Sequence, residues 1–318
     1  MSARQHQLAT VAAIVVGLMV AAQSRINGDL AAELAESAGS TTAAGIQAAL
    51  LSFATGLVLL AAVAVVLPRM RRGLAGLAAA VRQRKLLPWQ LLGGLGGAWL
   101  VTTQGLTVPT LGVALFIVAV VAGQTAASLG VDAAGLGPAG RMPVTGRRVL
   151  AAALALLAVA VTALPRIDAD AGAAAGFLAL LVISAGAGIA VQQALNGRVA
   201  VAARYPPAAA VVNFVIGTAA LMVVTLAGLL AFGWGVGELP DQPVLYLSGP
   251  LGVAFIAIAA WAVPVVGVLA FGLASISGQL VGGAVLDLLL PQPGVTVGPG
   301  LVIGIALTVL AVLVGNRR

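Results

Sequence analysis

The chain has 318 residues, of which 61% are apolar and 8% charged, and its mean hydropathy is +1.13. This composition excludes a water-soluble domain, because a soluble surface needs roughly a quarter of its residues charged. The absence of cysteine and the single histidine, His6, exclude disulfides, zinc–thiolate sites, multi-histidine metal sites and histidine-based triads. No set of residues points to an enzyme, a metal or a cofactor.

Ten apolar segments follow one another along the chain, and each is about as long as the roughly 20 residues that cross a bilayer as a helix. We expect these spans at about 8–27, 42–67, 88–107, 110–131, 148–164, 176–197, 207–232, 243–262, 264–287 and 298–315. Only Val108–Thr110 separates the third span from the fourth, and only Val263 and Pro264 separate the eighth from the ninth. Each link predicts a tight helical hairpin, with Pro109 and Pro264 in the first turn of the helix that follows.

The basic residues predict how the chain sits in the membrane. With a cytoplasmic N-terminus, fourteen of the sixteen Lys and Arg residues lie inside, and only Arg25 and Arg166 lie outside. This positive-inside distribution indicates a multi-pass protein of the inner (cell) membrane with both termini in the cytoplasm. The net charge of +7 therefore belongs to cytoplasmic loops, and we expect no nucleic-acid partner. The basic segment 69–85 is expected to form an amphipathic piece on the anionic inner leaflet.

The second half of the chain repeats the first. Residues 88–138 align without gaps on 243–293, with fourteen of 51 positions identical. The Gln23/Asn27 pair matches Gln192/Asn196, and Ser52-Phe53-x-x-Gly56 parallels Asn213-Phe214-x-x-Gly217. We expect two five-helix repeats, at 1–168 and 169–318. Because five is odd, the second repeat must enter the bilayer from the opposite side, and inverted repeats of this kind are typical of alternating-access transporters.

The same residues resemble a known family. Units with Q-x-x-x-N in the first helix, [SN]-F-x-x-G in the second and G-Q…D in the fourth resemble the YdcZ-type branch of the drug/metabolite transporter (DMT) superfamily. The closest stretches are QQALNGRVA (192–200), NFVIGT (213–218) and SGQLVGGAVLD (277–287). Many members of that branch are single five-span chains, and this chain resembles a fused pair. The resemblance implies an all-α, ten-helix inverted-repeat carrier (EamA-like), with its cavity among helices 1–4 and 6–9 and with helices 5 and 10 at the periphery.

Polar side chains within apolar spans need a partner or water, which makes them candidates for a transport site. The candidates for the substrate cavity or its gates are Gln23, Asn27, Trp99, Gln104, Gln124, Gln192, Asn196, Asn213 and Gln279. Their depth predicts two symmetry-related clusters beside a central cavity, with Gln23, Asn27, Gln279 and Asp287 outside and Gln124, Asp132, Gln192 and Asn196 inside. Alternatively, these amides only hydrogen-bond neighbouring helices, at about 0.6 kcal/mol each.

Asp132 and Asp287 end matching spans of the two repeats and are candidates for proton coupling. The alternative is a solvated charge at a helix end, since Asp132 lies near Arg141 in the sequence. Together these features predict a secondary transporter of a small organic metabolite or drug-like solute, as a monomer or homodimer in the lipid bilayer. The alternatives are a lipid or lipid-linked flippase and, from another class, a non-transporting membrane scaffold.

Overall fold

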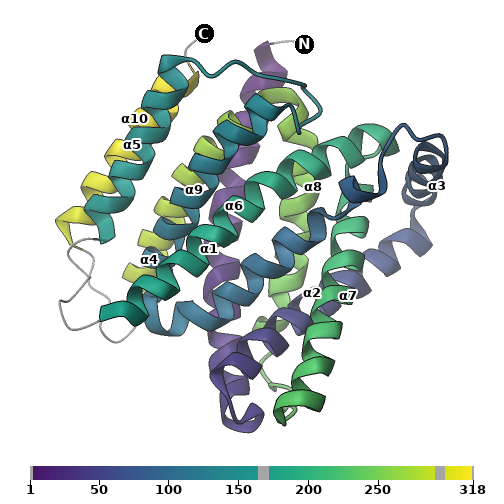
Figure 1. Ribbon diagram of the computed structural model, residues 1–318, viewed down its shortest axis with the longest axis vertical. Helices are drawn as coiled ribbons and strands as arrows, with labels where there is room; N and C mark the ends of the chain where they lie inside the picture. Colours follow the sequence, from purple (N-terminus) through teal and green to yellow (C-terminus); the bar gives the residue numbers. More distant parts are fainter. Residues whose placement is uncertain (1–2, 164–171, 291–297, 317–318) are drawn as a thin grey trace.

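The computed structural model describes residues 3–163, 172–290 and 298–316, and in these ranges the chain is helical without a strand. Figure 1 shows the helices packed as one bundle, with both termini at the same end and with α5 and α10 paired along one edge. The helices are α1 (Ala3–Ala38), α2 (Thr41–Val66), α3 (Pro68–Arg82), α4 (Gly93–Ala134), α5 (Gly146–Ala163), α6 (Gly172–Ala203), α7 (Pro207–Phe232), α8 (Ser248–Val266), α9 (Val268–Leu289) and α10 (Pro299–Asn316), with short 3-10 helices η1 (Pro88–Leu91) and η4 (Pro243–Leu247).

Among the described residues, five helical segments are long and apolar enough to cross a bilayer. They are Arg4–Ala38, Thr41–Val66, Leu180–Ala203, Pro207–Phe232 and Pro243–Val266. Ala270–Leu286 and Val302–Ala311 are apolar but shorter. The protein is therefore an all-α, multi-pass membrane protein.

The first predicted link, at Val108–Thr110, is not a break between two helices. α4 is helical through this position with Pro109 inside it, so the expectation that Pro109 begins a new helix is wrong. Nevertheless α4 folds back on itself (Figure 1). A methyl group on Gly96 would lie 2.6 Å from the Gly188 carbonyl oxygen, and one on Gly123 would overlap the Ile183 carbonyl oxygen. A straight helix would hold Gly96 and Gly123 about 40 Å apart. Pro109 lies between these two glycines and favours a break there, because a proline removes one helical hydrogen bond and its ring clashes with the preceding turn.

The second link breaks three residues later than predicted. Pro264 lies in the last turn of α8, and the helix ends at Gly267. Gly267 has a φ of +85° and a ψ of 163°, a conformation that residues with a side chain rarely adopt. The glycine, rather than the proline, therefore sets the boundary between α8 and α9.

The basic segment 69–85 forms most of helix α3 and the turn after it. Its buried residues, Met70, Gly73, Leu77 and Ala80, follow a helical spacing and face α6 and α7. Arg69, Arg71, Arg72 and Arg82 are exposed. The amphipathic segment is thus a surface helix that packs on the bundle through a stripe of small and apolar side chains.

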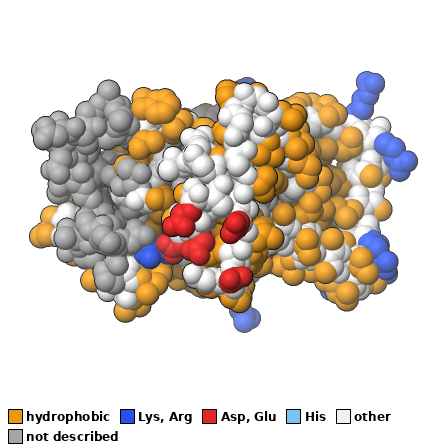
Figure 2. Space-filling model, turned by 90° about the horizontal axis from the view of Figure 1, so that it is seen from below, with side chains coloured by type: hydrophobic (Ala, Val, Ile, Leu, Met, Phe, Trp, Pro, Cys, Tyr) orange, Lys and Arg blue, Asp and Glu red, His pale blue; other side chains and the backbone are white. Residues whose placement is uncertain are grey.

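The charges separate along the long axis of the bundle. Figure 2 views the end opposite the termini, where acidic side chains gather. Asp29, Glu33 and Glu36 lie in the last turns of α1, and Glu238 and Asp241 follow α7. α3, with its arginines, lies away from this acidic end, on the right-hand flank and in the upper half of the bundle in Figure 1.

The segment after α7 is fastened across the acidic end. The Gln47 side chain donates to the Gly235 carbonyl and accepts from the Gly237 N–H, both at 2.7 Å. The Gly235 N–H also donates to the Ala38 carbonyl at 3.1 Å. These bonds hold the segment against the ends of α1 and α2 and close this end of the bundle.

Candidate functional site

A small central cavity lies between α1, α2, α4, α6, α7 and α8. Its empty space is about 290 Å³, but the centre of a water-sized sphere can move through only about 20 Å³ of it. That is room for about one water molecule. All lining residues are buried, and they form six pairs that the repeat relates: Gln23/Gln192, Ser52/Asn213, Phe53/Phe214, Gly97/Gly252, Leu100/Phe255 and Val101/Ile256.

Glycines bring the helices close enough to form this cavity. A methyl group on Gly94 would overlap the Asn213 carbonyl oxygen, so α4 lies directly against the backbone of α7. At the equivalent position of the second repeat, a methyl group on Gly249 would overlap the Ser52 carbonyl oxygen of α2. Close approach through small residues is the usual way that membrane helices pack. The result places Ser52 and Asn213 at corresponding points of the cavity wall.

Gln192 is a polar side chain of the cavity whose donor and acceptor are both left without a partner by the described residues. It is 1% exposed, and neither its Oε1 nor its Nε2 has a hydrogen-bond partner within the described ranges. Two neighbouring oxygens, Ser52 Oγ and Asn213 Oδ1, also find no partner there. Because a buried polar group is costly unless it is hydrogen-bonded, these atoms indicate a place for a polar guest, such as a water molecule or a solute.

Gln23, the repeat partner of Gln192, is engaged instead. Its Nε2 donates to the Ser248 carbonyl of α8 at 2.8 Å. The two glutamines therefore occupy corresponding positions in the cavity but differ in their bonding. The described structure is not symmetric at the level of its hydrogen bonds.

Beside Gln23, a buried amide network joins α1 to α4. Asn27 Nδ2 donates to Gln104 Oε1 at 2.6 Å, and Gln104 Nε2 donates to Ser24 Oγ at 2.9 Å. The second repeat has Ala259 in place of Gln104. There Asn196 Oδ1 accepts a longer bond, of 3.4 Å, from Asn213 Nδ2. The connection around Asn27 is thus the tighter of the two.

The other predicted site residues lie away from the cavity wall. Trp99 is 36% exposed, and its Nε1 donates to Ser184 Oγ at 2.8 Å. Gln124 donates to Gln193 on α6 at 3.4 Å. Gln279 donates to Ser275, one turn earlier on its own helix, at 3.2 Å.

Two glutamines that the sequence interpretation placed beside a central cavity line the same cavity in the structure. That interpretation assigned Gln23 to the outer and Gln192 to the inner of two clusters beside this cavity. It missed the apolar part of the wall, although Phe53 and Phe214 stand in a motif that recurs in both repeats.

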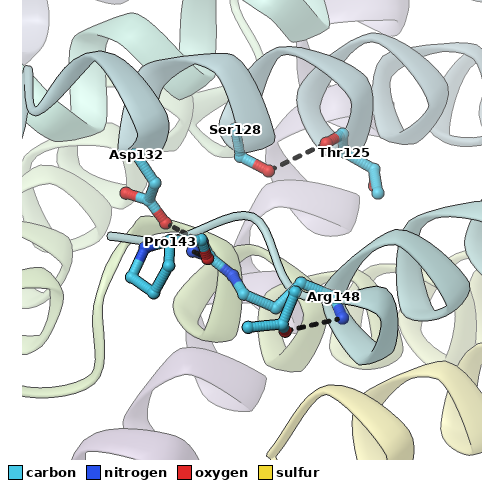
Figure 3. Close-up of polar contacts among 6 residues, drawn as sticks. Thr125, Ser128, Asp132, Pro143 and Arg148 are labelled. Atoms are coloured by element: carbon cyan, nitrogen blue, oxygen red, sulfur yellow. Dashed lines mark hydrogen bonds and ion pairs between the residues drawn. The ribbon is translucent and has the colours of Figure 1, made fainter. Parts of the chain in front are cut away.

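Asp132 has a partner that the sequence did not suggest. The carboxylate is 3% exposed and forms an ion pair with Arg148 of α5, as Figure 3 shows. Arg148 Nη1 also donates to the Pro143 carbonyl at 3.0 Å. The expected solvated charge near Arg141 is therefore wrong, because the turn after Gly135 brings the start of α5 back over the end of α4. Asp287 lies near the end of α9, and its side chain is outside the described part of the structure.

Comparisons with known proteins agree with this architecture. A family described as "Putative inner membrane exporter, YdcZ" matches the chain twice, at residues 8–161 and 177–314. No curated protein matches the chain. A solved structure described only as "Crystal structure of protein" has a TM-score of 0.57 and 19% identity, over 99% of this chain and 97% of its own, which shows a shared fold. Since the family's model covers most of the sequence in two copies, the chain belongs to the YdcZ family of the DMT superfamily and is a membrane transporter.

Proposed function

We propose that the protein is a secondary transporter that moves a small organic solute by alternating access of two inverted repeats. The observation that carries this proposal is the composition of the central cavity, because every residue that lines it has its repeat partner in the same wall. Such a cavity lies on the axis that relates the repeats. Secondary transporters with inverted repeats bind their substrates at this position.

Contacts outside the cavity support a two-fold relation between the repeats. A methyl group on Gly17 of α1 would overlap the Ser275 carbonyl oxygen of α9, and one on Gly186 of α6 would overlap the Val120 carbonyl oxygen of α4. Gly17 and Gly186 are repeat partners, as are Val120 and Ser275. The glycine of each repeat therefore packs on the same position of the other repeat, which is the pattern of an isologous, two-fold interface.

The different bonding of the two glutamines suggests how the cycle runs. Gln23 binds the Ser248 carbonyl, whereas Gln192 does not make the equivalent bond to the Gly93 carbonyl. In alternating access the repeats exchange conformations. We therefore expect the opposite state to have Gln192 bonded to Gly93 and Gln23 released into the cavity.

The lining points to a class of substrate. Of the residues that the structure describes, none with a charged side chain lines the cavity. Gln192 offers both a donor and an acceptor, while Phe53, Phe214 and Phe255 supply apolar surface. We infer a solute without net charge, neutral or zwitterionic, that pairs with an amide through one part and packs on aromatic rings through another.

The test is a flux screen with purified protein in liposomes, followed by a variant pair. In Gln192→Leu the cavity loses its free amide, and we expect flux of the transported solute to fall about tenfold or more, with little change in melting temperature. Gln193→Leu is the matched control, because the Gln193 side chain is next to Gln192 in the sequence but binds Gln124 and does not line the cavity. Equal flux in the two variants would contradict the site.

The same screen separates the other classes of function. A scaffold would move no solute, and a flippase would move only labelled lipid. Imposing and removing a pH gradient across the liposomes then tests whether the transport is coupled to protons.

A further inference from the structure

A second hollow lies on the flank of the bundle, between α3 and the C-terminal end of α6. Its volume is about 800 Å³, and it is open to the outside. Six of its sixteen lining residues are glycine or alanine, among them Gly73, Gly76 and Ala203. A methyl group on Gly73 would lie 2.9 Å from Tyr205 Cβ, so this glycine lets α3 lie close to the turn between α6 and α7. We call this hollow the basic cleft.

Five cationic side chains line the basic cleft: Arg69, Arg72, Lys85, Arg198 and Arg204. Among the described residues, no Asp or Glu lines the cleft. The two ion pairs of the described ranges, Arg25–Asp29 and Arg148–Asp132, do not involve any residue of the cleft. Arg198 is held in place by its bond from Nη2 to the Gly135 carbonyl at 2.6 Å. The cleft thus concentrates positive charge that no carboxylate of the described chain neutralises, which favours an anionic ligand with several acceptor oxygens.

The surroundings of the cleft favour a lipid over a soluble anion. Val65 and Val66, directly before α3, are 73% and 72% exposed, and Val201 in the cleft wall is 56% exposed. Val65 and Val66 are the last two residues of α2, a helix that is long and apolar enough to cross the bilayer. Exposed apolar side chains next to a cationic hollow match a ligand that has a charged head and hydrocarbon chains.

We propose that the basic cleft binds the phosphate headgroup of an anionic phospholipid of the leaflet that α3 contacts. The arginines pair with the phosphate oxygens, and the acyl chains lie along the exposed valines at the end of α2. This proposal does not depend on transport, because it concerns a surface separate from the central cavity.

The experiment measures lipid binding by native mass spectrometry of the full-length protein released from detergent. Phosphatidylglycerol is the anionic probe, phosphatidylcholine the zwitterionic control, and glycerol 3-phosphate a soluble phosphate without chains. We expect phosphatidylglycerol to bind in preference to phosphatidylcholine. In Arg69→Gln/Arg72→Gln its dissociation constant should rise about 30-fold, because each cation near the headgroup contributes about 1 kcal/mol.

Two further variants keep the outcome decisive. Arg71→Gln/Arg82→Gln removes two arginines of the same helix that do not line the cleft, so its binding should stay within about threefold of the parent. Arg69→Lys/Arg72→Lys should retain most of the affinity and shows that the site tolerates substitution. The site would be overturned if both glutamine variants lost the same affinity for phosphatidylglycerol, or if the parent protein did not prefer phosphatidylglycerol to phosphatidylcholine. If glycerol 3-phosphate bound as tightly as phosphatidylglycerol, the assignment to a lipid would be overturned.

Discussion

Phe53 and Phe214 meet at the cavity with ring centroids 4.8 Å apart and ring planes inclined by 33°. Each ring also covers the glycine that follows the other phenylalanine by three positions. A methyl group on Gly56 would overlap the Phe214 ring, and one on Gly217 would overlap the Phe53 ring. The repeated phenylalanine and glycine are therefore parts of one contact. The phenylalanine ring of each repeat packs against the glycine of the other repeat, where a larger residue would leave no room for the ring.

This exchange predicts specific energetic coupling. Gly56→Ala should lower stability by about 1–3 kcal/mol, because the added methyl group pushes against the Phe214 ring. Phe214→Ala removes the ring and leaves room for the methyl group, so the double variant should lose less than the sum of the two single losses. Reversible unfolding in mixed micelles measures the four stabilities. Strict additivity would show that Gly56 and Phe214 do not share a contact.

Two glycines of α4 make an internal comparison. Gly123→Ala should destabilise the protein, because a methyl group there would overlap the Ile183 carbonyl oxygen of α6 and force the helices apart. Gly130 has open space around its Cα, so Gly130→Ala should be neutral or raise stability by up to about 1 kcal/mol through helix propensity. Melting temperatures of the two variants in the same detergent decide the point. If the melting temperature falls by the same amount in both variants, the inference that α4 and α6 cross closely at Gly123 is wrong.

The Asp132–Arg148 ion pair predicts a structural role for Asp132. Asp132→Asn should cost about 3 kcal/mol, because it leaves the largely buried Arg148 guanidinium without its counter-charge. Asp132→Asn/Arg148→Gln removes both charges and should recover part of that loss. Thermal melts give the stabilities, and flux with and without a pH gradient gives the function. A folded Asp132→Asn protein that has lost its response to the gradient would instead assign proton coupling to this carboxylate.

Much of the fold follows from constraints that sequence records directly. A bilayer demands apolar helical segments, and a duplicated gene leaves matching residues such as Gln23 and Gln192 in the same order in both halves. The helix boundaries at the prolines could not be read in the same way. Proline usually begins a helix, but within a membrane protein neighbouring groups can satisfy the freed carbonyl, so Pro109 and Pro264 remain inside helices.

The candidate site was harder to predict, because a residue's depth does not say which way it faces. Trp99 and Gln104 are close in sequence, yet Trp99 lies at the surface while Gln104 is fully buried beside Asn27. The facing is set by how helices cross, and the crossings depend on glycines such as Gly94. Phe53 lacks a polar group that would mark it as unusual within an apolar span, so only its recurrence as Phe214 could have signalled its place at the cavity.

The opposite insertion of the two repeats can be tested at single residues. The sequence contains no cysteine, so one introduced cysteine is the only thiol that a maleimide can label. Glu36 and Asp241 are exposed near the acidic end of the bundle, and Arg71 and Arg204 are exposed on or beside the basic cleft. Because positive charge is retained in the cytoplasm, we expect a membrane-impermeant maleimide to label Glu36→Cys and Asp241→Cys in intact cells.

Arg71→Cys and Arg204→Cys should react only after the membrane is permeabilised, and that second labelling shows that both cysteines are present and accessible. Glu36 lies in the last turn of α1 in one repeat, and Arg204 directly follows α6, the equivalent helix of the other. If both positions react from the same side, the two repeats enter the membrane in the same direction. An exchange of conformations between inverted repeats would then be impossible, whatever the central cavity binds.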